Sequence, residues 1–321
     1  MYVGLFIFLI ILLVFVKLGI IKLEKNTIFG LLSIALVFII GLFIFNTFNV
    51  TNTMKEEKIH SIIEHISSLA ETKETFLEYF IEEQEDKIAI IAITQNLTTQ
   101  NLIDIVKTND EFYEVFILDS NGNEILTSNI YEKPEKDFLD EEEYRFNLGE
   151  TYFGKIEYDD EFNRYGLVIS TPYKNGLLVA KIKIDELNEI IKDSTEVSQT
   201  AETLAAYRND DGDAVFFTFR RFESEITAED IISKDKLDIP ITQALLKNED
   251  VFLDFNDYRD VPVISVTRYI DEIDIGLVSK IDEEEALMPI LQSINEIWIF
   301  TAAIILSIMI IGVVFYILLT K

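Results

Sequence analysis

The sequence of 321 residues contains no cysteine, which excludes disulfide bonds, zinc–thiolate sites and cysteine nucleophiles. It contains only two histidines, His60 and His65. Five residues apart on a helix, their rings would point about 140° from each other, so a single metal ion could not easily bind both. We therefore expect solvated helix residues at these positions, and neither a metal site nor a cofactor.

Glycine motifs that bind phosphate are also missing. Neither Gly-x-x-x-x-Gly-Lys nor Gly-x-Gly-x-x-Gly occurs in the chain. The acidic segment Asp119–Asn123 is superficially similar to a calcium loop, but its glycine comes two positions early. Ile130 stands where such a loop needs a bidentate Glu, so a hairpin turn is the better interpretation. With no catalytic constellation, we expect a protein that is not an enzyme.

Basic residues are scarce, with 27 Lys and Arg against 57 Asp and Glu, and the formal net charge is −30. So acidic a surface repels nucleic acid, and we exclude nucleic-acid binding. The mean hydropathy is nevertheless +0.21, which is unusual for a highly charged soluble protein. The two values are compatible if the apolar residues are concentrated in membrane spans and the charged residues lie between them.

Three apolar runs are long enough to cross a hydrocarbon core of about 30 Å. They are Tyr2–Ile21, Ile28–Phe48 and Ile297–Leu319. The first lacks the basic start and small-residue cleavage site of a signal peptide, so we interpret it as a span. Lys22 and Lys25 lie between the first two runs, and Lys321 follows the third. The positive-inside rule places these lysines in the cytoplasm and the large acidic segment outside.

The stretch Lys55–Gln95 organises the external segment. Its apolar residues recur at helical spacing, and no Pro or Gly interrupts it. These residues are Ile59, Ile62, Ile63, Ile66, Leu69, Leu77, Phe80 and Ile88. A helix of this length would extend roughly 60 Å. We interpret it as a spine on which other modules pack.

The period then changes from that of a helix to that of strands. A short helix, Thr99–Lys107, precedes five expected strands, and a second helix, Asp185–Ile191, follows them. The strands are Val115–Leu118, Glu124–Thr127, Thr151–Tyr158, Leu167–Thr171 and Leu177–Ile184. Helices followed by a five-stranded antiparallel sheet are the α+β pattern of a PAS-like module.

The next part of the chain repeats this pattern. Val168-Ile169-Ser170 recurs 95 positions later as Val263-Ile264-Ser265, and Leu178–Ile182 recurs 99 positions later as Leu277–Ile281. The second copy has expected strands at Glu202–Tyr207, Val215–Phe219, Val251–Phe255, Val261–Arg268 and Ile275–Ile281, with a helix at Ile241–Leu246. We therefore predict a membrane hairpin (1–49), a spine with a short helix (50–110), a membrane-distal module (111–194), a membrane-proximal module (195–296) and a third span (297–321).

Three stretches of the second module resemble the membrane-proximal half of double Cache sensor domains of bacterial histidine kinases, cyclic-dinucleotide cyclases and chemoreceptors. They are Thr200–Thr203, Tyr258–Val263 and Gly276–Asp282. Ala201 and Asp260 stand where the family usually has Gly, and Ile275 where it has Trp; these departures affect turns and packing. The resemblance covers roughly Lys55 to Trp298. It implies an α+β fold in which a long N-terminal helix carries two tandem Cache modules, flanked by transmembrane helices of a bacterial or archaeal plasma membrane.

The resemblance also implies a ligand pocket in the distal module, between the sheet and the segment ahead of the third strand. Candidate pocket residues are Tyr144, Arg145, Tyr152, Tyr158, Asp159, Thr171, Tyr173 and Lys181. Arg145 is suited to a carboxylate through its planar fork, and the aromatic residues are suited to pocket walls. Alternatively, the tyrosines are half-buried strand residues and Arg145 pairs with a neighbouring Glu. Phe146 stands where the family's amino-acid-binding signature has Trp, so an amino-acid ligand is not implied.

The function implied is that of an extracytoplasmic sensor in two-component or chemotaxis signalling. It would bind a small molecule of unknown identity and pass a conformational signal through the third span. Because the sequence stops two residues past that span, we expect a separate or missing output domain. Two alternatives remain open: the sensory half of a truncated histidine kinase or diguanylate cyclase, and a non-signalling surface interaction protein. Besides the ligand, the expected partners are membrane lipid and either a second copy of the chain or a signalling partner chain.

Two expectations concern the approach to the third span. Asp282–Glu296 contains one Pro, Pro289, and no Gly, and its apolar residues keep a single stripe. We expect a helix that is continuous into the span, or only kinked at Pro289. The acidic runs Glu141–Glu143 and Glu283–Glu285 are interpreted as solvated faces.

Overall fold

The computed structural model describes residues 25–94, 96–129, 149, 151–159, 162, 164–192, 198–218, 220–222 and 231–320. The chain divides into two compact units, one formed by Met1–His60 and Leu287–Lys321, the other by Ser61–Ala286. The first expected span and the candidate residues Tyr144 and Arg145 lie outside the described residues, as do Glu141–Glu143.

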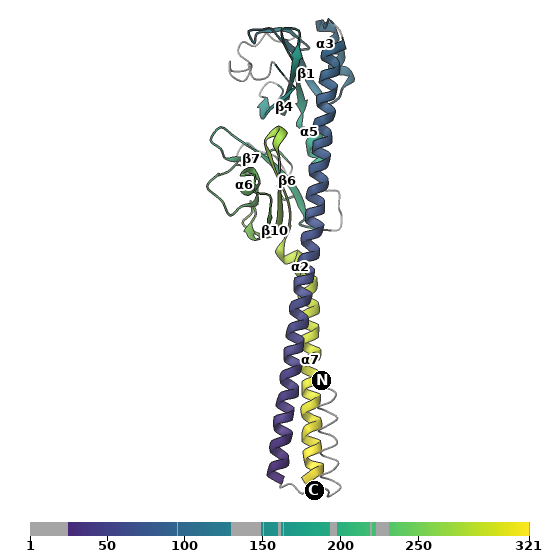
Figure 1. Ribbon diagram of the computed structural model, residues 1–321, viewed down its shortest axis with the longest axis vertical. Helices are drawn as coiled ribbons and strands as arrows, with labels where there is room; N and C mark the ends of the chain where they lie inside the picture. Colours follow the sequence, from purple (N-terminus) through teal and green to yellow (C-terminus); the bar gives the residue numbers. More distant parts are fainter. Residues whose placement is uncertain are drawn as a thin grey trace. The chain divides into compact units, whose positions relative to one another are not determined.

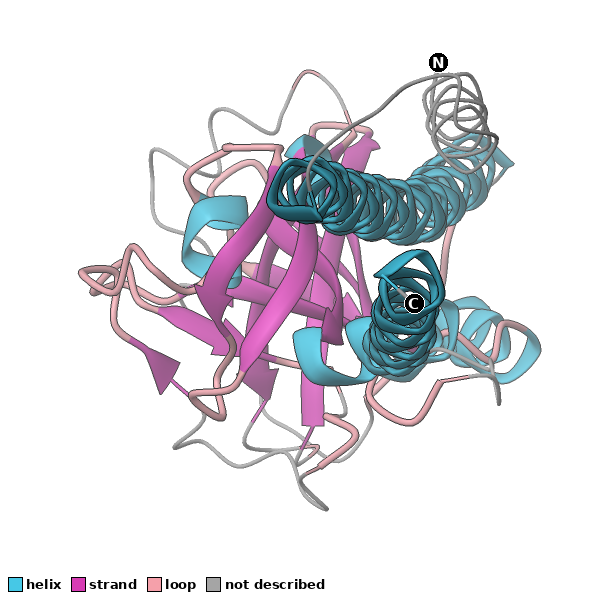
Figure 2. Ribbon diagram, turned by 90° about the horizontal axis from the view of Figure 1, so that it is seen from below, coloured by secondary structure: helices cyan, strands magenta, loops and turns pink. Residues whose placement is uncertain are grey.

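Helix α2 (Lys25–Thr94) is the long helix expected from the apolar stripe, and it has no break at Lys55. Within the larger unit, its buried residues fall into two sets. Ile62, Ile66 and Ala70 form a cluster with strand residues of the proximal module. Leu77, Phe80, Ile81 and Ile88 belong to the main core together with the distal module. The strands of both modules lie along one side of this helix (Figures 1 and 2). The long N-terminal helix that carries two sheet modules is confirmed.

The distal module is a five-stranded antiparallel sheet, as the sequence predicts, and its strands lie in the order β2-β1-β5-β4-β3. Its elements are α3 (Thr99–Thr108), β1 (Phe112–Leu118), β2 (Glu124–Thr127), β3 (Tyr152–Asp159), β4 (Arg164–Tyr173), β5 (Gly176–Lys183) and α5 (Ile184–Ile191). The Asp119 carboxylate accepts hydrogen bonds from the backbone N–H of Asn121 (2.7 Å) and Asn123 (3.0 Å), and Gly122 has φ +82°. The acidic segment is therefore a hairpin turn between β1 and β2.

Alternation along the strands gives the distal sheet two distinct faces. One, here called the spine face, carries Leu167 and Ile169 of β4, which share the main core with α2. The opposite, outer face carries a separate apolar cluster of Phe116, Leu118, Leu177 and Val179, with Val168 against it. All of these residues except Val168 are almost fully buried. The outer face is therefore a second packed surface rather than a solvated one.

The proximal module is a six-stranded sheet in the order β8-β7-β6-β11-β10-β9. Its elements are β6 (Glu202–Arg208), β7 (Ala214–Phe216), β8 (Ile231–Ile232), α6 (Pro240–Leu245), β9 (Val251–Asn256), β10 (Pro262–Ile270), the 3-10 turn η1 (Asp271–Ile273) and β11 (Ile275–Asp282). Helix α6 packs on the outer face of this sheet through Ile241, Ala244 and Leu245. A Cβ on Gly276 of β11 would lie 2.9 Å from the Ala244 Cβ, so glycine permits this close packing.

The pairing registers refine the internal repeat. Val168 of β4 lies opposite Lys181, whereas Ser265 of β10 lies opposite Lys280. Equivalent residues of these two strands are thus 265 − 168 = 97 positions apart, not 95 as the short sequence match indicates. The Val-Ile-Ser sequence match is displaced by two residues from the structural register. A shift of two is the smallest one that keeps each matched residue on the same face of its sheet.

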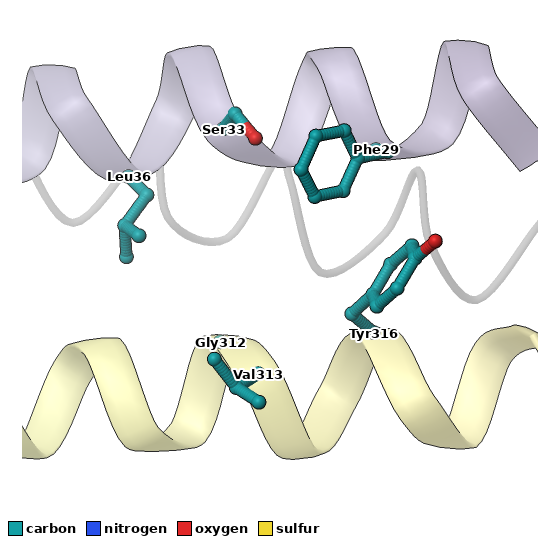
Figure 3. A pocket seen from close by; sticks show the side chains of 6 residues that line it. All are labelled: Phe29, Ser33, Leu36, Gly312, Val313 and Tyr316. Atoms are coloured by element: carbon teal, nitrogen blue, oxygen red, sulfur yellow. The ribbon is translucent and has the colours of Figure 1, made fainter.

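The smaller unit contains the N-terminal part of α2 and most of α7 (Glu283–Thr320). Helix α7 is continuous with Pro289 inside it, which confirms the expectation for this segment. Both helices contain stretches long and apolar enough to cross a membrane. The hydroxyls of Thr47 and Thr301 form a buried hydrogen bond of 2.9 Å between the two helices. An apolar groove lies between the start of α2 and the end of α7 (Figure 3). It is lined by Phe29, Ser33, Leu36, Gly312, Val313 and Tyr316.

Candidate functional site

A lysine with two carboxylates lies on the outer face of the distal sheet. Lys181 of β5 is paired in register with Glu114 of β1, and Asp159 ends β3 two strands away. The Lys181 Nζ lies 2.9 Å from Glu114 Oε2 and 2.9 Å from Asp159 Oδ2. The three side chains are only 11%, 7% and 12% exposed. Buried charges are tolerated when they are paired and hydrogen-bonded, and this arrangement, here called the distal triad, fulfils both conditions.

The pairing determines the protonation states of the triad. Burial acts to lower the pKa of Lys181, but hydrogen bonds to Glu114 and Asp159 outweigh it and raise the pKa above its ordinary value. Burial likewise acts to raise the pKa of Asp159, and its hydrogen bond with Lys181 more than reverses this effect. Both shifts favour the charged forms of Lys181 and Asp159 at neutral pH.

Aromatic residues and an arginine surround the triad. The Tyr113 hydroxyl donates to Asp159 Oδ2 at 3.2 Å, and burial raises the pKa of that hydroxyl far above its ordinary value. The Tyr113 ring packs edge-on against Phe162, with centroids 5.0 Å apart, and the Arg164 guanidinium lies 5.6 Å from the Tyr113 centroid. A Cβ on Gly166 would lie 2.1 Å from the Tyr113 hydroxyl, so only glycine leaves room for it.

Two polar atoms in this region have no hydrogen-bond partner among the described residues. They are the Ser170 Oγ and the Arg164 Nε, and both are buried. Ser170 lies on β4 opposite Val179 of the outer-face cluster, two positions along the strand from the residue that faces Lys181. Buried donors without partners are rare in native proteins and cost free energy. These two groups are therefore able to hydrogen-bond an additional molecule.

The structure brings together only some of the predicted site residues. Asp159 and Lys181 are in direct contact, and Tyr152 lies opposite Ser170 and so on the same face. Thr171 and Tyr173 point to the spine face instead. There the Thr171 hydroxyl bonds the Thr151 hydroxyl at 2.9 Å, and the Tyr173 Oη accepts from the Leu97 N–H at 2.9 Å.

The remaining described candidate, Tyr158, is 47% exposed and packs edge-on against Tyr165. Four residues of the region were not expected from the sequence: Tyr113, Glu114, Arg164 and Ser170. The alternation in β1 contained a signal for one of them. Glu114 is the one charged residue within the strand Phe112–Leu118, which is unusual for a strand that is otherwise buried.

The proximal module contains the same arrangement. Lys280 of β11 is paired in register with Glu202 of β6, and its Nζ lies 2.7 Å from Glu202 Oε1 and also bonds Asp257. These residues, here called the proximal triad, follow their distal counterparts by 280 − 181 = 99, 202 − 114 = 88 and 257 − 159 = 98 positions. The repeat therefore includes a buried ion cluster as well as strands.

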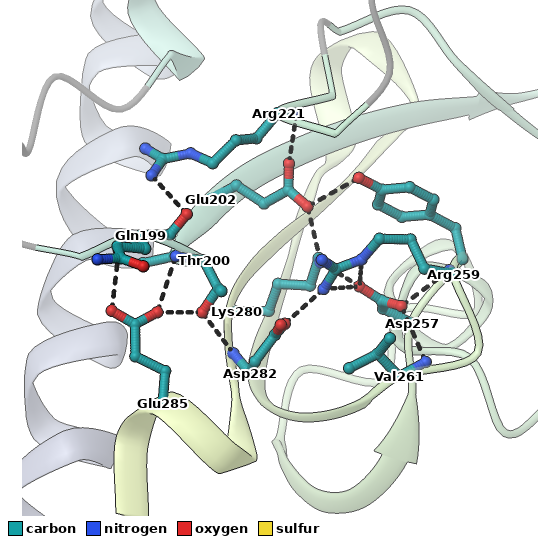
Figure 4. Close-up of polar contacts among 12 residues, drawn as sticks. Gln199, Thr200, Glu202, Arg221, Asp257, Arg259, Val261, Lys280, Asp282 and Glu285 are labelled. Atoms are coloured by element: carbon teal, nitrogen blue, oxygen red, sulfur yellow. Dashed lines mark hydrogen bonds and ion pairs between the residues drawn. The ribbon is translucent and has the colours of Figure 1, made fainter. Parts of the chain in front are cut away.

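The proximal triad is more tightly enclosed than the distal one. Its side chains are 1%, 5% and 2% exposed. Arg259 bridges Asp257 to Asp282, and the Tyr258 hydroxyl donates to Glu202 at 3.0 Å (Figure 4). A small hollow, lined by residues of β6, β7, α6 and β11 together with Asp257 and Tyr258, lies beside it. We conclude that the proximal cluster is part of a closed core.

No group of His, Cys, Asp and Glu able to hold a metal ion occurs among the described residues.

The acidic run at the start of α7 is partly different from expectation. Glu285 is not a solvated residue, because its carboxylate accepts hydrogen bonds from the backbone N–H groups of Gln199 and Thr200, both at 2.8 Å. The sequence did not show this contact because its partners are 85 and 86 positions away.

One known protein family matches most of the chain. The family described as Cache domain matches residues 50–290. No curated protein sequence matches the chain. Among solved structures, the sensory domain of the Campylobacter jejuni chemoreceptor Tlp3 with isoleucine bound has 15% identity and a TM-score of 0.51, covering 73% of this chain and 98% of that one. The ligand-binding domain of Tlp3 in complex with L-norvaline has 15% identity and a TM-score of 0.50, covering 72% and 94%. These similarities show a common fold.

Proposed function

The chain belongs to the double Cache family of sensor domains, and from this premise we propose that it is a membrane-anchored extracytoplasmic receptor. In this proposal the distal module binds a small molecule on its outer face. The signal leaves through α7 to an output domain on a partner chain, on a second copy or in a continuation of the chain. The single observation that supports the location is the distal triad with its neighbouring unpartnered donors, Ser170 Oγ and Arg164 Nε.

Comparison of the two modules supports the choice of the distal one. Both contain a buried Lys with two carboxylates on the outer face. In the proximal module, α6 packs on that face and Arg259 and Tyr258 complete the polar contacts. The distal triad is the more accessible of the two, and its ion pairs lie beside the rings of Tyr113 and Phe162. Such a combination of polar groups and apolar walls is typical of a ligand pocket.

The proposed topology predicts the location of inserted reporters. A reporter enzyme after Glu24 is expected in the cytoplasm, and one in the exposed turn at Asp210–Asp213 outside, because Lys22 and Lys25 mark the cytoplasmic side. The measurement is the activity of alkaline phosphatase and β-galactosidase fusions at both positions. A cytoplasmic signal from the Asp210–Asp213 fusion would eliminate the receptor hypothesis.

The proposed ligand site predicts a difference between two buried serines, one on the outer face of each sheet. The full chain is screened by thermal shift against amino acids, organic acids, amines and nucleosides; a compound at 100 times its Kd should raise stability by about 2.7 kcal/mol. Ser170→Ala is expected to weaken binding of the selected compound about tenfold, because one hydrogen bond in a buried site is lost.

The matched control is Ser265→Ala, which removes a buried, equally unpartnered hydroxyl from the outer face of the proximal sheet. We expect unchanged affinity for this variant. If Ser170→Ala keeps wild-type affinity, or Ser265→Ala loses it, the ligand site is misplaced.

A further inference from the structure

A lysine of the spine helix binds the end of α5, whose apolar residues also share the main core with α2. The Lys73 Nζ of α2 donates to the carbonyl oxygen of Ile190 at 2.8 Å and to that of Lys192 at 3.0 Å. The last carbonyl groups of a helix lack partners within the helix, and a cation at this end is favourable. The point at which the chain leaves the distal module is therefore held on α2.

Six positions later, the chain is fixed to the start of α7. Glu285, the third residue of α7, has a carboxylate that accepts hydrogen bonds from the N–H of Gln199 and of Thr200 at 2.8 Å. It also accepts bonds from the hydroxyls of Thr200 and Ser198, the latter at 3.2 Å to both oxygens. Burial acts to raise the pKa of Glu285, but the hydrogen bonds outweigh it and lower the pKa below its ordinary value, so the acceptor is ionised at neutral pH.

The junction is closed from the opposite direction by Thr200. Its hydroxyl accepts a hydrogen bond from the N–H of Asp282, the last residue of β11, at 3.1 Å. One side chain thus bonds both the end of the last strand and the first turn of the helix that follows it (Figure 4). A displacement of residues 198–200 cannot occur without breaking contacts on both sides of the β11–α7 junction.

The same segment is also held on the proximal core. The Arg221 Nη1 donates to the carbonyl oxygens of Ser198 (2.8 Å) and Gln199 (3.1 Å), and the Arg221 N–H donates to Glu202 Oε2 at 2.9 Å. Glu202 in turn pairs with Lys280 of the proximal triad. The closed ion cluster of the proximal module therefore supports the segment that Glu285 binds, and its burial makes this support rigid.

We infer that Glu285 is a positioning residue that couples the exit of the distal module to the first turn of α7. The inference rests on the proposed function, since it assigns the proximal module the role of a mechanical joint in the sensor. A covalent connection alone would not transmit a displacement, because a flexible connection absorbs it. Coupling requires contacts that differ between two states of the chain, and we assign this role to the hydrogen bonds from residues 198–200 to the Glu285 carboxylate.

The test is a double-mutant cycle on the full chain in lipid nanodiscs, and it needs no ligand. The chain has no cysteine, so a single spin label attached through Glu284→Cys reports the motion of the first turn of α7. Releasing α5 with Lys73→Met is expected to increase the mobility of the label. In the Glu285→Ala background the same Lys73→Met change is expected to have no further effect.

Amide exchange supplies the direct readout of the contact. Glu285→Ala is expected to raise the exchange of the Gln199 and Thr200 amides about tenfold, because each loses a charged acceptor. Glu283→Ala, which removes an acid from the same turn, should leave both amides unchanged. Lys87→Met is the control for Lys73→Met; it breaks a different contact of α2, the pair with Glu111, and should not affect the label.

Three outcomes would overturn the inference: Lys73→Met changing the label equally in both backgrounds, Lys73→Met changing it in neither, or wild-type exchange of the two amides in Glu285→Ala. Glu285→Gln keeps one acceptor oxygen and replaces Glu285→Ala if that variant fails to fold. Its amide exchange is expected to lie between that of the wild type and that of Glu285→Ala. A protein that bound no small molecule would still show this coupling. Failure here is thus distinguishable from failure of the proposed function.

Discussion

Replacing Lys280 with methionine is expected to lower the free energy of unfolding by about 3–5 kcal/mol, because the buried Glu202 loses its cationic partner and Asp257 keeps only Arg259. The Lys280 side chain is 1% exposed and the two carboxylates that it neutralises, Glu202 and Asp257, are 5% and 2% exposed. Methionine matches the lysine stem in length, so the change removes the charge and leaves little cavity. The measurement is urea unfolding of the full chain, followed by circular dichroism.

Lys247→Met is the matched control. Lys247 forms an ion pair with Asp271, but the two side chains are 58% and 74% exposed, and such pairs contribute about 0–1 kcal/mol. Adding Glu202→Gln to Lys280→Met should recover part of the loss, since the buried carboxylate that has lost its cation is then replaced by a neutral amide. Equal stability of Lys280→Met and Lys247→Met would show that the proximal triad is not the closed core described here.

Inserting Gly-Gly-Ser-Gly after Gln292 is expected to abolish signalling while ligand binding survives. Helix α7 is continuous from Glu283 to Thr320, and only a stiff helix can carry a displacement along its axis. Four flexible residues would interrupt the helical hydrogen bonds and absorb the displacement. The measurement is autophosphorylation of a histidine-kinase domain fused after Lys321, with and without the compound selected by thermal shift.

The control for this insertion has the same length but helical residues. Ala-Ala-Ala-Ala after Gln292 keeps the helix and rotates the part beyond it by about 40°. We expect a changed level of kinase activity that still responds to the compound. A normal response from the Gly-Gly-Ser-Gly variant would mean that the signal does not leave through α7.

Most of the fold was predictable from hydrophobic periodicity, and three elements show where this signal is sufficient and where it fails. The strand β2 begins and ends at the predicted residues, because Glu124–Thr127 is bounded by a turn with a Gly at positive φ. The strand β8 was missed because it contains only Ile231 and Ile232, too few residues to show any alternation. The apolar stripe of α2 predicted its buried face, including Ile62, Leu77 and Ile88.

The candidate site was less predictable, because it depends on which face each strand turns inward. Asp159 and Lys181 were expected in the pocket and do form a pair, whereas Thr171 and Tyr173 lie on the spine face. Both faces of this sheet are buried, so polarity alone could not assign β4 to either side. Glu114 and Glu285 were not singled out because a paired acidic residue and a solvated one look identical in sequence.

The proposal that the distal module binds the ligand is tested most directly by hydrogen–deuterium exchange of the full chain in nanodiscs. The exchange is measured with and without the compound selected by thermal shift. We expect protection of β4 and β5 on the distal sheet, around Ser170 and Lys181, and no direct protection of β10 and β11. Protection centred on β10 and β11 instead, with the distal strands unchanged, would contradict the claim that the distal module is the sensor.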